Sequence, residues 1–379
     1  MCYKPINRKT SSIAIDTCER IILPNQQVIE LEEYSPPTNG REGMLRLDFN
    51  ENTTGCSPKV VQALKTIDAN KLSVYPEYGA FLSKLSKFQK VRVEELVLTN
   101  GTDEAINIIL NAFVESGDEV IIPTPTFAMF KFFATIAGAK TRQVLYNKDL
   151  SFPFELVMSA ISEKTKIVVL VNPNNPTGTV IPEEQIVKIV EKAKENGAIV
   201  LIDEAYYEFY GKTSLWLIGK YNNLFITRTF SKAYGLAGLR IGYIMGDERI
   251  IASIKKSISP YSVNALATIC ASAALDDFEF VEEYVKEVIN NRVKVAGEIE
   301  KLGVKTCPSS ANFVLCYFGE KCQAVCAGLK KKGILVRNRT NDPLLKGCVR
   351  IGVGTKEQNE QLMLALKEVL IEIEKKVIE

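Results

Sequence analysis

The sequence predicts an α/β protein in which a mainly parallel central sheet carries helices on both faces and is joined to a smaller α+β region. Three observations predict this class. Short β-rich runs alternate with amphipathic segments from about residue 95 to residue 246, a pattern typical of parallel sheets. After about residue 261, one long amphipathic segment and two strand-like runs follow. The length of 379 residues also exceeds that of one ordinary core, which favours more than one domain.

The expected strands of the central sheet are short runs rich in β-branched residues. They are LVLTN (96–100), EVIIP (119–123), KIVVLVN (166–172), AIVLID (198–203), LFITRT (224–229) and RIGYIMG (240–246). Between them, PEEQIVKIVEKAKENG (182–197) is typical of a helix that opens with proline and closes at glycine.

The C-terminal third predicts the smaller region. An apolar stripe at helical spacing indicates a core-facing helix rather than a coiled coil, because it stops at Gly303; it consists of Val281, Val285, Val288, Val295, Ile299 and Leu302. The strand-like runs NFVLCYF (312–318) and CVRIGVG (348–354) then lead into a final helix from about Glu357. Residues 1 to about 40 are polar and rich in turn formers, so we expect an arm that packs on another surface.

Composition indicates a small-molecule partner. The chain has 47 basic and 45 acidic residues and no basic block, so nothing favours a nucleic-acid or membrane surface. The N-terminus lacks a secretory signal and no segment is long and apolar enough to span a bilayer, which predicts a soluble, cytoplasmic protein. The nine cysteines have no framework spacing and are expected as free thiols. Cys322 and Cys326, four apart on an expected helix, indicate packing rather than metal binding.

The chain contains no histidine. This absence excludes Ser-His and Cys-His nucleophile pairs and histidine-ligated metal sites, and it removes the commonest general base. Catalysis must therefore depend on Lys, Asp, Glu, Tyr, Cys or a cofactor, and we expect no metal.

Polar clusters follow five of the expected strands at their C-terminal ends. They are Asn100-Gly101-Thr102-Asp103, Thr124-Pro125-Thr126-Phe127, NPNNPTG (172–178), Asp203-Glu204-Ala205-Tyr206-Tyr207, and RTFSKAYGLAGLR (228–240). In an open α/β sheet the ligand crevice lies outside the carboxyl ends of the strands. We therefore expect the five clusters to converge on one site.

Each cluster also has a purely structural interpretation. Asn100-Gly101-Thr102 is either a turn with a helix cap or a phosphate-binding helix N-terminus. NPNNPTG is either a plain loop of turn formers or a structure more elaborate than the commonest turns. Asp203 is either an exposed cap at the rim of the sheet or a carboxylate that holds a cationic partner. The sequence around these residues leaves the alternatives open.

Two interpretations of Lys232 are possible from the sequence: an ordinary surface lysine, or a reactive amine. To attack a carbonyl, its amine must lose a proton, which costs about 4 kcal/mol and requires a desolvated or cationic neighbourhood. Arg240 could contribute to that field and could clamp a phosphate. The segment GKTS (211–214) resembles the end of a P-loop, but Tyr206 stands where that motif needs glycine, and no strand is followed by a G-x-G-x-x-G motif. ATP-binding and dinucleotide-binding loops are therefore not expected.

The motifs NPNNPTG, DEAYYEF and RTFSKAYGLAGLR, in this order and together with LDFNENTTG (47–55) and VRIGVGT (349–355), resemble those of the fold type I pyridoxal-phosphate aminotransferases. Within them the chain is most similar to the histidinol-phosphate aminotransferase family. The resemblance implies a large cofactor-binding domain over residues 71–262. It also implies a small domain over 263–379, and places residues 1–70 as the arm and the first part of that small domain.

The resemblance implies roles for the clustered residues toward pyridoxal 5′-phosphate. Lys232 would hold the cofactor covalently and, once released, carry a proton between substrate and cofactor; Asp203 would pair with the pyridine nitrogen. Asn175 and Tyr206 would bind the cofactor's 3′-oxygen, and Phe127 would stack on the ring where many relatives carry tyrosine. The phosphate would be held by Gly101, Thr102, Asp103, Thr229, Ser231 and Arg240. Tyr75, in VYPEYG, would reach the phosphate in a neighbouring subunit, which implies a homodimer.

The resemblance also assigns the substrate. Arg350 would bind the α-carboxylate, with Asn175 beside it, and Arg337 and Tyr34 match positions that bind the phosphate of histidinol phosphate. The implied reaction converts histidinol phosphate and 2-oxoglutarate to imidazole acetol phosphate and glutamate, a step of histidine biosynthesis. Alternatives are transamination of aromatic amino acids, and decarboxylation as in threonine-phosphate decarboxylases. A cofactor-binding regulator is less favoured, because the arm is too short and too weakly basic to supply a DNA-binding module.

Overall fold

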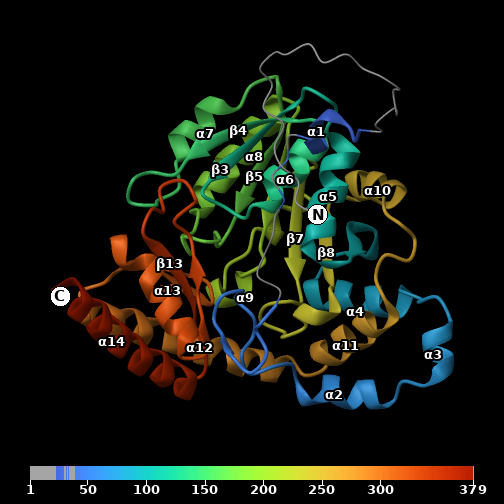
Figure 1. The fold of residues 1–379 in the computed structure, drawn as a ribbon. Helices are drawn as coiled ribbons and strands as arrows, with labels where there is room; N and C mark the ends of the chain where they lie inside the picture. Colours follow the sequence, from blue (N-terminus) through green and yellow to red (C-terminus); the bar gives the residue numbers. More distant parts are fainter. Residues whose placement is uncertain (1–22, 30, 32, 34–38, 379) are drawn as a thin grey trace, which may run out of the picture. The chain divides into compact units, whose positions relative to one another are not determined.

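The central sheet is built from the β-branched runs that the sequence indicates (Figure 1). Within the residues that the computed structural model describes, which are 23–29, 31, 33 and 39–378, it has seven strands in the order β2-β8-β7-β6-β5-β3-β4. The strands are β2 (Leu96–Thr99), β3 (Glu119–Thr124), β4 (Lys140–Leu145), β5 (Thr165–Val171), β6 (Ile199–Asp203), β7 (Leu224–Thr229) and β8 (Gly242–Gly246). All six predicted strands are present. The seventh, β4, lies at the sheet edge and is mostly exposed, so it carries no continuous apolar run.

The sheet is mainly parallel, as predicted. β3, β4, β5, β6 and β7 pair in parallel, whereas β8 runs antiparallel to both of its neighbours, β7 and β2. Because two reversals restore the direction, β2 points the same way as β7. The five strands that precede the polar clusters therefore all end at one edge of the sheet.

Alternating side chains of the strands form two apolar layers, one on each face. Val97, Val120 and Leu201 pack in one layer with helices α5 (Gly101–Phe113), α6 (Met129–Ile136) and α10 (Glu248–Ser257). Leu98, Ile121 and Ile202 pack in the other, with α4 (Gly79–Gln89), α7 (Phe154–Ala160), α8 (Glu183–Glu195) and α11 (Ala265–Leu275). This division follows from the two-residue period of a strand.

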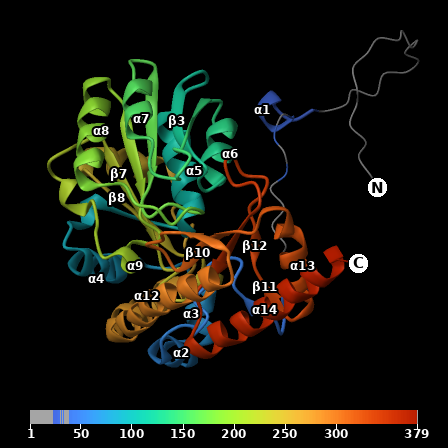
Figure 2. The same ribbon diagram turned by 90° about the vertical axis from the view of Figure 1, so that its left-hand side faces the viewer.

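The C-terminal part contains a second, antiparallel sheet with the strand order β12-β13-β10-β9. Its strands are β9 (Lys305–Cys307), β10 (Phe313–Tyr317), β12 (Arg337–Asn338) and β13 (Cys348–Gly352). Figure 2 shows the helices of this part beside β10; they are α12 (Phe278–Lys301), α13 (Cys322–Lys331) and α14 (Lys356–Ile378). The predicted stripe on α12 is confirmed, because most of its members are buried in the core.

The segment that precedes α2 (Pro58–Lys65) joins this C-terminal part through strand pairing. β1 (Leu45–Arg46) pairs in parallel with β11 (Ile334–Leu335), and the chain then continues through Leu47, which is bonded to Leu335 and Gly352. Two further short helices lie elsewhere in the fold: α3 (Ala69–Ser73) follows α2, and α9 (Tyr207–Tyr210) follows β6. The 3-10 turns are η1 (Val93–Glu95), η2 (Leu215–Leu217), η3 (Ala237–Leu239) and η4 (Gly319–Lys321).

The chain divides into two units, Met1–Tyr34 and Ser35–Glu379, and the three sheets of the described residues belong to the second. In the first unit the described structure includes the short helix α1 (Gln26–Ile29). The predicted domain boundaries near residues 70 and 262 stay predictions. No helix in the described part of the chain is long and apolar enough to cross a membrane.

Candidate active site

Asp203 is the centre of the carboxyl edge of the sheet. It ends β6 at 4% exposure and accepts a hydrogen bond from Thr227 Oγ1 on β7 at 2.9 Å. Its backbone oxygen accepts from Asn172 N at the end of β5, also at 2.9 Å. Three neighbouring strand ends therefore hold this carboxylate, which is buried rather than an exposed cap.

Burial gives Asp203 an unusual acidity. Desolvation raises the pKa of the carboxyl to about 7, the hydrogen bond from Thr227 opposes the rise, and the nearby negative charges of Asp103 and Glu204 add to it. No ion pair to Asp203 is found among the described residues. A buried carboxylate of this kind is stabilised by a cationic ligand group such as a protonated ring nitrogen.

Lys232 follows β7 and points back into the site. Its Nζ donates to the backbone oxygen of Phe49 at 2.9 Å and lies 5.8 Å from the centroid of the Tyr206 ring. The side chain is half-buried, so it is not an ordinary solvated lysine. The structure thus brings Lys232 and Tyr206 together, although they come from different strand ends.

Asn175 connects the central sheet to the C-terminal part. It lies in the NPNNPTG loop, whose Asn172–Pro173 and Asn175–Pro176 bonds are cis. The Oδ1 of Asn175 accepts from Arg350 Nη1, and Arg350 Nη2 donates to the backbone oxygen of Asp48. Arg350 is 5% exposed on β13, so the predicted carboxylate ligand faces the same loop as its predicted neighbour.

The predicted phosphate ligands gather at the N-terminus of α5. Gly101 begins this helix with φ +76°, and the side chain of the preceding residue, Asn100, forms no capping hydrogen bond. A Cβ on Gly101 would lie 2.4 Å from Arg240 Nη2, so only glycine leaves room for that guanidinium. Arg240 pairs with Asp103 of the same turn at 3.0 Å.

Two hydroxyls come from the end of β7. Thr229 and Ser231 are buried, and Thr229 Oγ1 accepts from Ser231 N at 3.0 Å. Gly242 allows the close approach of β8 to the turn, because a Cβ there would lie 3.0 Å from Thr102 N. Free amide groups, hydroxyls and a guanidinium around one helix N-terminus form a donor set suited to a phosphate.

Phe127 follows β3 and is half-buried against the apolar layer of α5 and α6, with its ring edge-on to Phe130 at 6.2 Å. Its loop is tied to NPNNPTG, because Thr126 Oγ1 donates to Asn174 Oδ1 at 2.7 Å and Asn174 Nδ2 donates to the Pro125 oxygen at 2.9 Å. The five predicted clusters therefore lie along one edge of the sheet. Their donors fit a ligand with a phosphate, a basic ring nitrogen and a carbonyl that an amine can attack.

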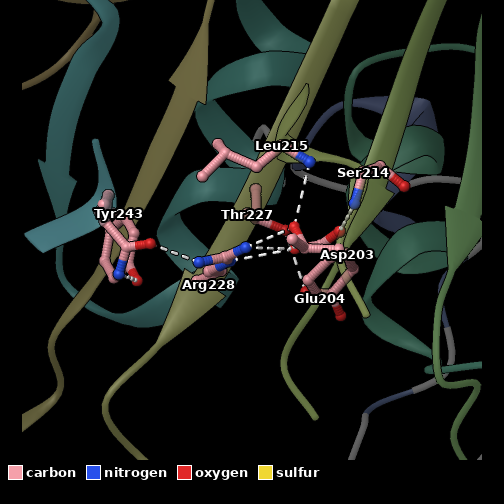
Figure 3. A network of polar contacts seen from close by, with 9 residues as sticks. Asp203, Glu204, Ser214, Leu215, Thr227, Arg228 and Tyr243 are labelled. Carbon is pink, nitrogen blue, oxygen red and sulfur yellow. Dashed lines mark hydrogen bonds and ion pairs between the residues drawn. The ribbon is translucent and has the colours of Figure 1, made fainter. Parts of the chain in front are cut away.

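A buried ion pair connects the ends of β6 and β7 at this edge of the sheet (Figure 3). Arg228 follows Thr227 in the chain, and Glu204 follows Asp203. The Nη2 of Arg228 lies 2.8 Å from the Oε2 of Glu204, and the two side chains are only 2% and 1% exposed. The guanidinium of Arg228 also lies 3.5 Å from the centroid of the Tyr207 ring. Charge–charge attraction of Glu204 helps to raise the pKa of Arg228, which burial alone would lower, so this guanidinium stays charged. The pair fixes β6 and β7 against each other at the residues that present Asp203.

Arg337, in β12 of the C-terminal part, lies near Phe49. Its guanidinium is 5.7 Å from the Phe49 ring centroid, and that of Arg41 is 4.0 Å from it. Arg41 pairs with Asp48 and Glu51, at 2.8 and 3.0 Å, whereas Arg337 forms no ion pair within the described residues. Arg337 therefore offers a positive charge beside Phe49, the residue whose backbone oxygen accepts a hydrogen bond from Lys232.

Two predicted site residues are not assembled in this way. Tyr34 lies outside the described residues. Tyr75 is 74% exposed and stacks on Tyr261, with ring centroids 4.3 Å apart.

Sequence analysis included Asp48, Phe49 and Asn50 in the motif LDFNENTTG but assigned none of them a place in the site. All three backbone oxygens accept hydrogen bonds from side chains around the site, and Asn50 Nδ2 donates to the Tyr206 hydroxyl at 2.9 Å. The local signal was DFNEN, where an apolar run stops at a row of polar residues, but no strand was expected there. Its partners lie more than 150 residues away in the chain, so the pattern itself could not identify them.

Comparison with known proteins places these features in a family. Residues 42–366 match the family described as aminotransferase class I and II. The chain is 40% identical over 330 residues to a histidinol-phosphate aminotransferase of Caldanaerobacter subterraneus subsp. tengcongensis, which covers 86% of this chain and 93% of the relative. It is 35% identical to histidinol-phosphate aminotransferase 1 of Bacillus cereus, over 93% of this chain and 98% of the relative. The crystal structure of histidinol-phosphate aminotransferase from Sinorhizobium meliloti in complex with pyridoxal-5′-phosphate is similar at TM-score 0.85 and 25% identity, covering 94% and 99% of the two chains.

Proposed function

The chain belongs to the class I and II aminotransferase family, and we propose that it is a cytoplasmic, homodimeric histidinol-phosphate aminotransferase with pyridoxal phosphate as its cofactor. The family membership confirms the predicted enzyme class and fold class. The observation that carries the proposal is the meeting of Lys232, Asp203, Tyr206 and Arg350 at the carboxyl edge of one sheet.

The cofactor fits the residues present. Asp203, buried and without an ion-pair partner among the described residues, would hold the pyridine nitrogen in its protonated form. The turn at Gly101 and Thr102, with Thr229, Ser231 and Arg240, would hold the phosphate. Phe127 would cover one face of the ring, and Asn175 and Tyr206 would donate to the 3′-oxygen. When bound, the cofactor supplies an electron sink for charge that develops at the substrate α-carbon.

Lys232 is the proposed proton carrier. Its Nζ would take the proton from the substrate α-carbon and return it at the cofactor's C4′ position. The Phe49 oxygen, 2.9 Å from Nζ in the structure, offers an acceptor that keeps the amine near the reacting atoms between these steps. A chain without histidine thereby places nucleophile and general base in one side chain.

The positive charges around Phe49 support a phosphorylated substrate. Arg350 would bind a carboxylate in a bidentate manner when the amino donor occupies the site, whereas Arg337 offers a separate guanidinium to a second anionic group. Histidinol phosphate carries such a group and an aromatic amino acid does not. We therefore propose that the phosphate of the substrate binds at Arg337.

The proposal of a homodimer is supported by an exposed apolar cluster. Leu72, Val74 and Tyr75 are exposed by 63–74%, and Tyr261, which stacks on Tyr75, is exposed by 52%. Apolar clusters of this kind mark protein–protein interfaces. Tyr75 would reach the phosphate of the cofactor in the partner subunit.

The first test addresses Lys232. Purified protein should show the visible absorbance of a lysine-bound cofactor, and borohydride should fix that cofactor to the chain. Lys232→Ala should lose the reducible link, because no other amine would lie at the cofactor aldehyde. The attachment site is read by mass spectrometry, and a link that persists in the variant would exclude the lysine assignment.

The second test addresses Arg337. Histidinol phosphate and phenylalanine are offered separately, and loss of the cofactor's visible absorbance is followed in single turnovers. Arg337→Ala should reduce turnover of histidinol phosphate about 100-fold or more, since one charge-assisted contact contributes about 3 kcal/mol, and should leave that of phenylalanine nearly unchanged. Equal losses for the two substrates would favour the aromatic aminotransferase alternative.

A further inference from the structure

The segment Asp48–Asn50 forms the floor of the proposed site through its backbone. The oxygen of Asp48 accepts from Arg350, that of Phe49 from Lys232 at 2.9 Å, and that of Asn50 from Asn312 at 3.0 Å. The proposed function uses these carbonyl groups only as supports. It gives no task to the Asn50 side chain, which contacts Tyr206.

Asn50 is buried, and of its two amide atoms only Nδ2 has a hydrogen-bond partner among the described residues. It is 2% exposed, its φ is +57°, and its Nδ2 donates to the Tyr206 hydroxyl at 2.9 Å. Asparagine is one of the few residues with a side chain that adopt this left-handed conformation readily. Tyr206 is also fixed, at 3% exposure with its ring edge-on to Phe313 at 5.4 Å. The contact is therefore a defined one between two buried side chains.

The direction of this hydrogen bond determines what the Tyr206 hydroxyl can do. A phenol hydroxyl has one hydrogen to donate and lone pairs that accept. Asn50 donates to the oxygen, so the hydrogen of the hydroxyl is left for another acceptor. Within the described residues no acceptor for that hydrogen is found, and the ammonium group of Lys232, with Nζ 5.8 Å from the Tyr206 ring centroid, cannot accept it.

We propose that Asn50 is a positioning residue whose amide occupies the accepting side of the Tyr206 hydroxyl and so directs the hydroxyl hydrogen to the phenolic oxygen of the cofactor. This inference rests on the proposed function. A donor at the phenolic oxygen stabilises the negative charge that this oxygen carries once the lysine-bound cofactor has lost its titrating proton. Asn50 therefore lowers the pKa of the lysine-bound cofactor through Tyr206, without touching the cofactor.

The experiment uses the holoenzyme and follows its visible absorbance as a function of pH. Asn50→Gly deletes the amide and keeps the left-handed backbone, since glycine adopts this φ freely. The pKa of the bound cofactor should rise by about half a unit to one unit, the shift that corresponds to one hydrogen bond of ordinary strength. Asn50→Asp, which has nearly the size of the native side chain, should raise it further, because a carboxylate accepts the hydroxyl hydrogen and withdraws it from the cofactor.

Asn52→Ala is the matched control. Asn52 anchors the same segment, with Nδ2 donating to the Ala233 oxygen at 2.9 Å, but has no contact with Tyr206. This variant should lose stability without a shift of the spectroscopic pKa. A purely structural role of Asn50 predicts that the glycine variant behaves like this control.

A double-mutant cycle separates the remaining outcomes. In a Tyr206→Phe background, Asn50→Gly should add no further shift, because the hydroxyl through which it acts is gone. A titration unchanged in both Asn50 variants, or an equal additional shift in the Tyr206→Phe background, would overturn the inference alone. If the glycine variant does not fold, the spectroscopic pKa of the Asn50→Asp variant tests the inference in its place. A wild-type protein without the visible band would overturn the proposed function and this inference with it.

Discussion

Asp203 shows how burial changes the acidity of one residue. A carboxyl in water has a pKa near 4, whereas burial raises that of Asp203 to about 7. The ligand-free protein is therefore destabilised by an ionised Asp203 above neutral pH. A bound cation at this position would remove the penalty, so the residue favours the loaded protein over the empty one.

Asp203→Asn should make the cofactor-free protein more stable at pH 8 and inactive. Because the folded pKa is raised, native Asp203 binds more protons than the unfolded chain, and its contribution to the free energy of unfolding falls as pH rises from about 4 to about 7. The full difference is on the order of 4 kcal/mol. Urea unfolding of the cofactor-free wild type and variant from pH 4 to pH 8 measures it. Parallel pH profiles for the two proteins would contradict the assignment.

At the scale of elements, β6 and β7 are fixed against each other where they leave the sheet. The Arg228–Glu204 pair joins these strand ends, and Glu204 Oε1 also accepts from Ser214 N in the loop after α9 (Figure 3). Buried ion pairs add little net stability compared with apolar packing, but the loss of one partner leaves an uncompensated charge. We therefore expect the pair to matter for the position of Asp203 and Thr227 rather than for the total stability.

Glu204→Ala should destabilise the protein by about 3–5 kcal/mol, because Arg228 stays charged and buried. The double replacement Glu204→Leu with Arg228→Met should recover most of that loss and still bind the cofactor more weakly, since the strand ends are no longer tied. Denaturant unfolding and cofactor titration give the two quantities. Glu298→Ala, which removes an exposed partner of Lys301 on α12, is the control and should leave the unfolding midpoint unchanged.

At the scale of the whole molecule, the exposed cluster of Leu72, Val74, Tyr75 and Tyr261 bears on assembly. Val74→Lys should produce a monomer that loses cofactor on gel filtration, because a charged ammonium group opposes burial in an apolar interface and Tyr75 would no longer reach the second site. Sedimentation velocity and the absorbance of the eluted protein report the two effects. Val293→Lys, at an equally exposed apolar residue of α12, should change neither. A Val74→Lys dimer with full cofactor would contradict the shared-site proposal.

Much of the fold could be predicted because its signals are local. β5 and β6 are buried apolar runs bounded by turn formers, and α12 repeats its apolar residues at helical spacing. β4 was missed because an edge strand such as KTRQVL presents charged side chains to solvent and so resembles a loop. Asp203, Lys232 and Asn175 could be predicted as candidate site residues because they follow such runs at the ends of parallel strands.

The sequence by itself determined the α/β class and the polar clusters that follow the strands at one edge of the sheet, since each depends on residues close together in the chain. Only the tertiary structure decided that Phe49 accepts from Lys232, that Asn50 contacts Tyr206, and that Arg350 reaches Asn175. These partners lie between 156 and 183 residues apart. Their meeting depends on how β1 and β13 pack beside the central sheet, and no periodicity or local motif encodes such packing.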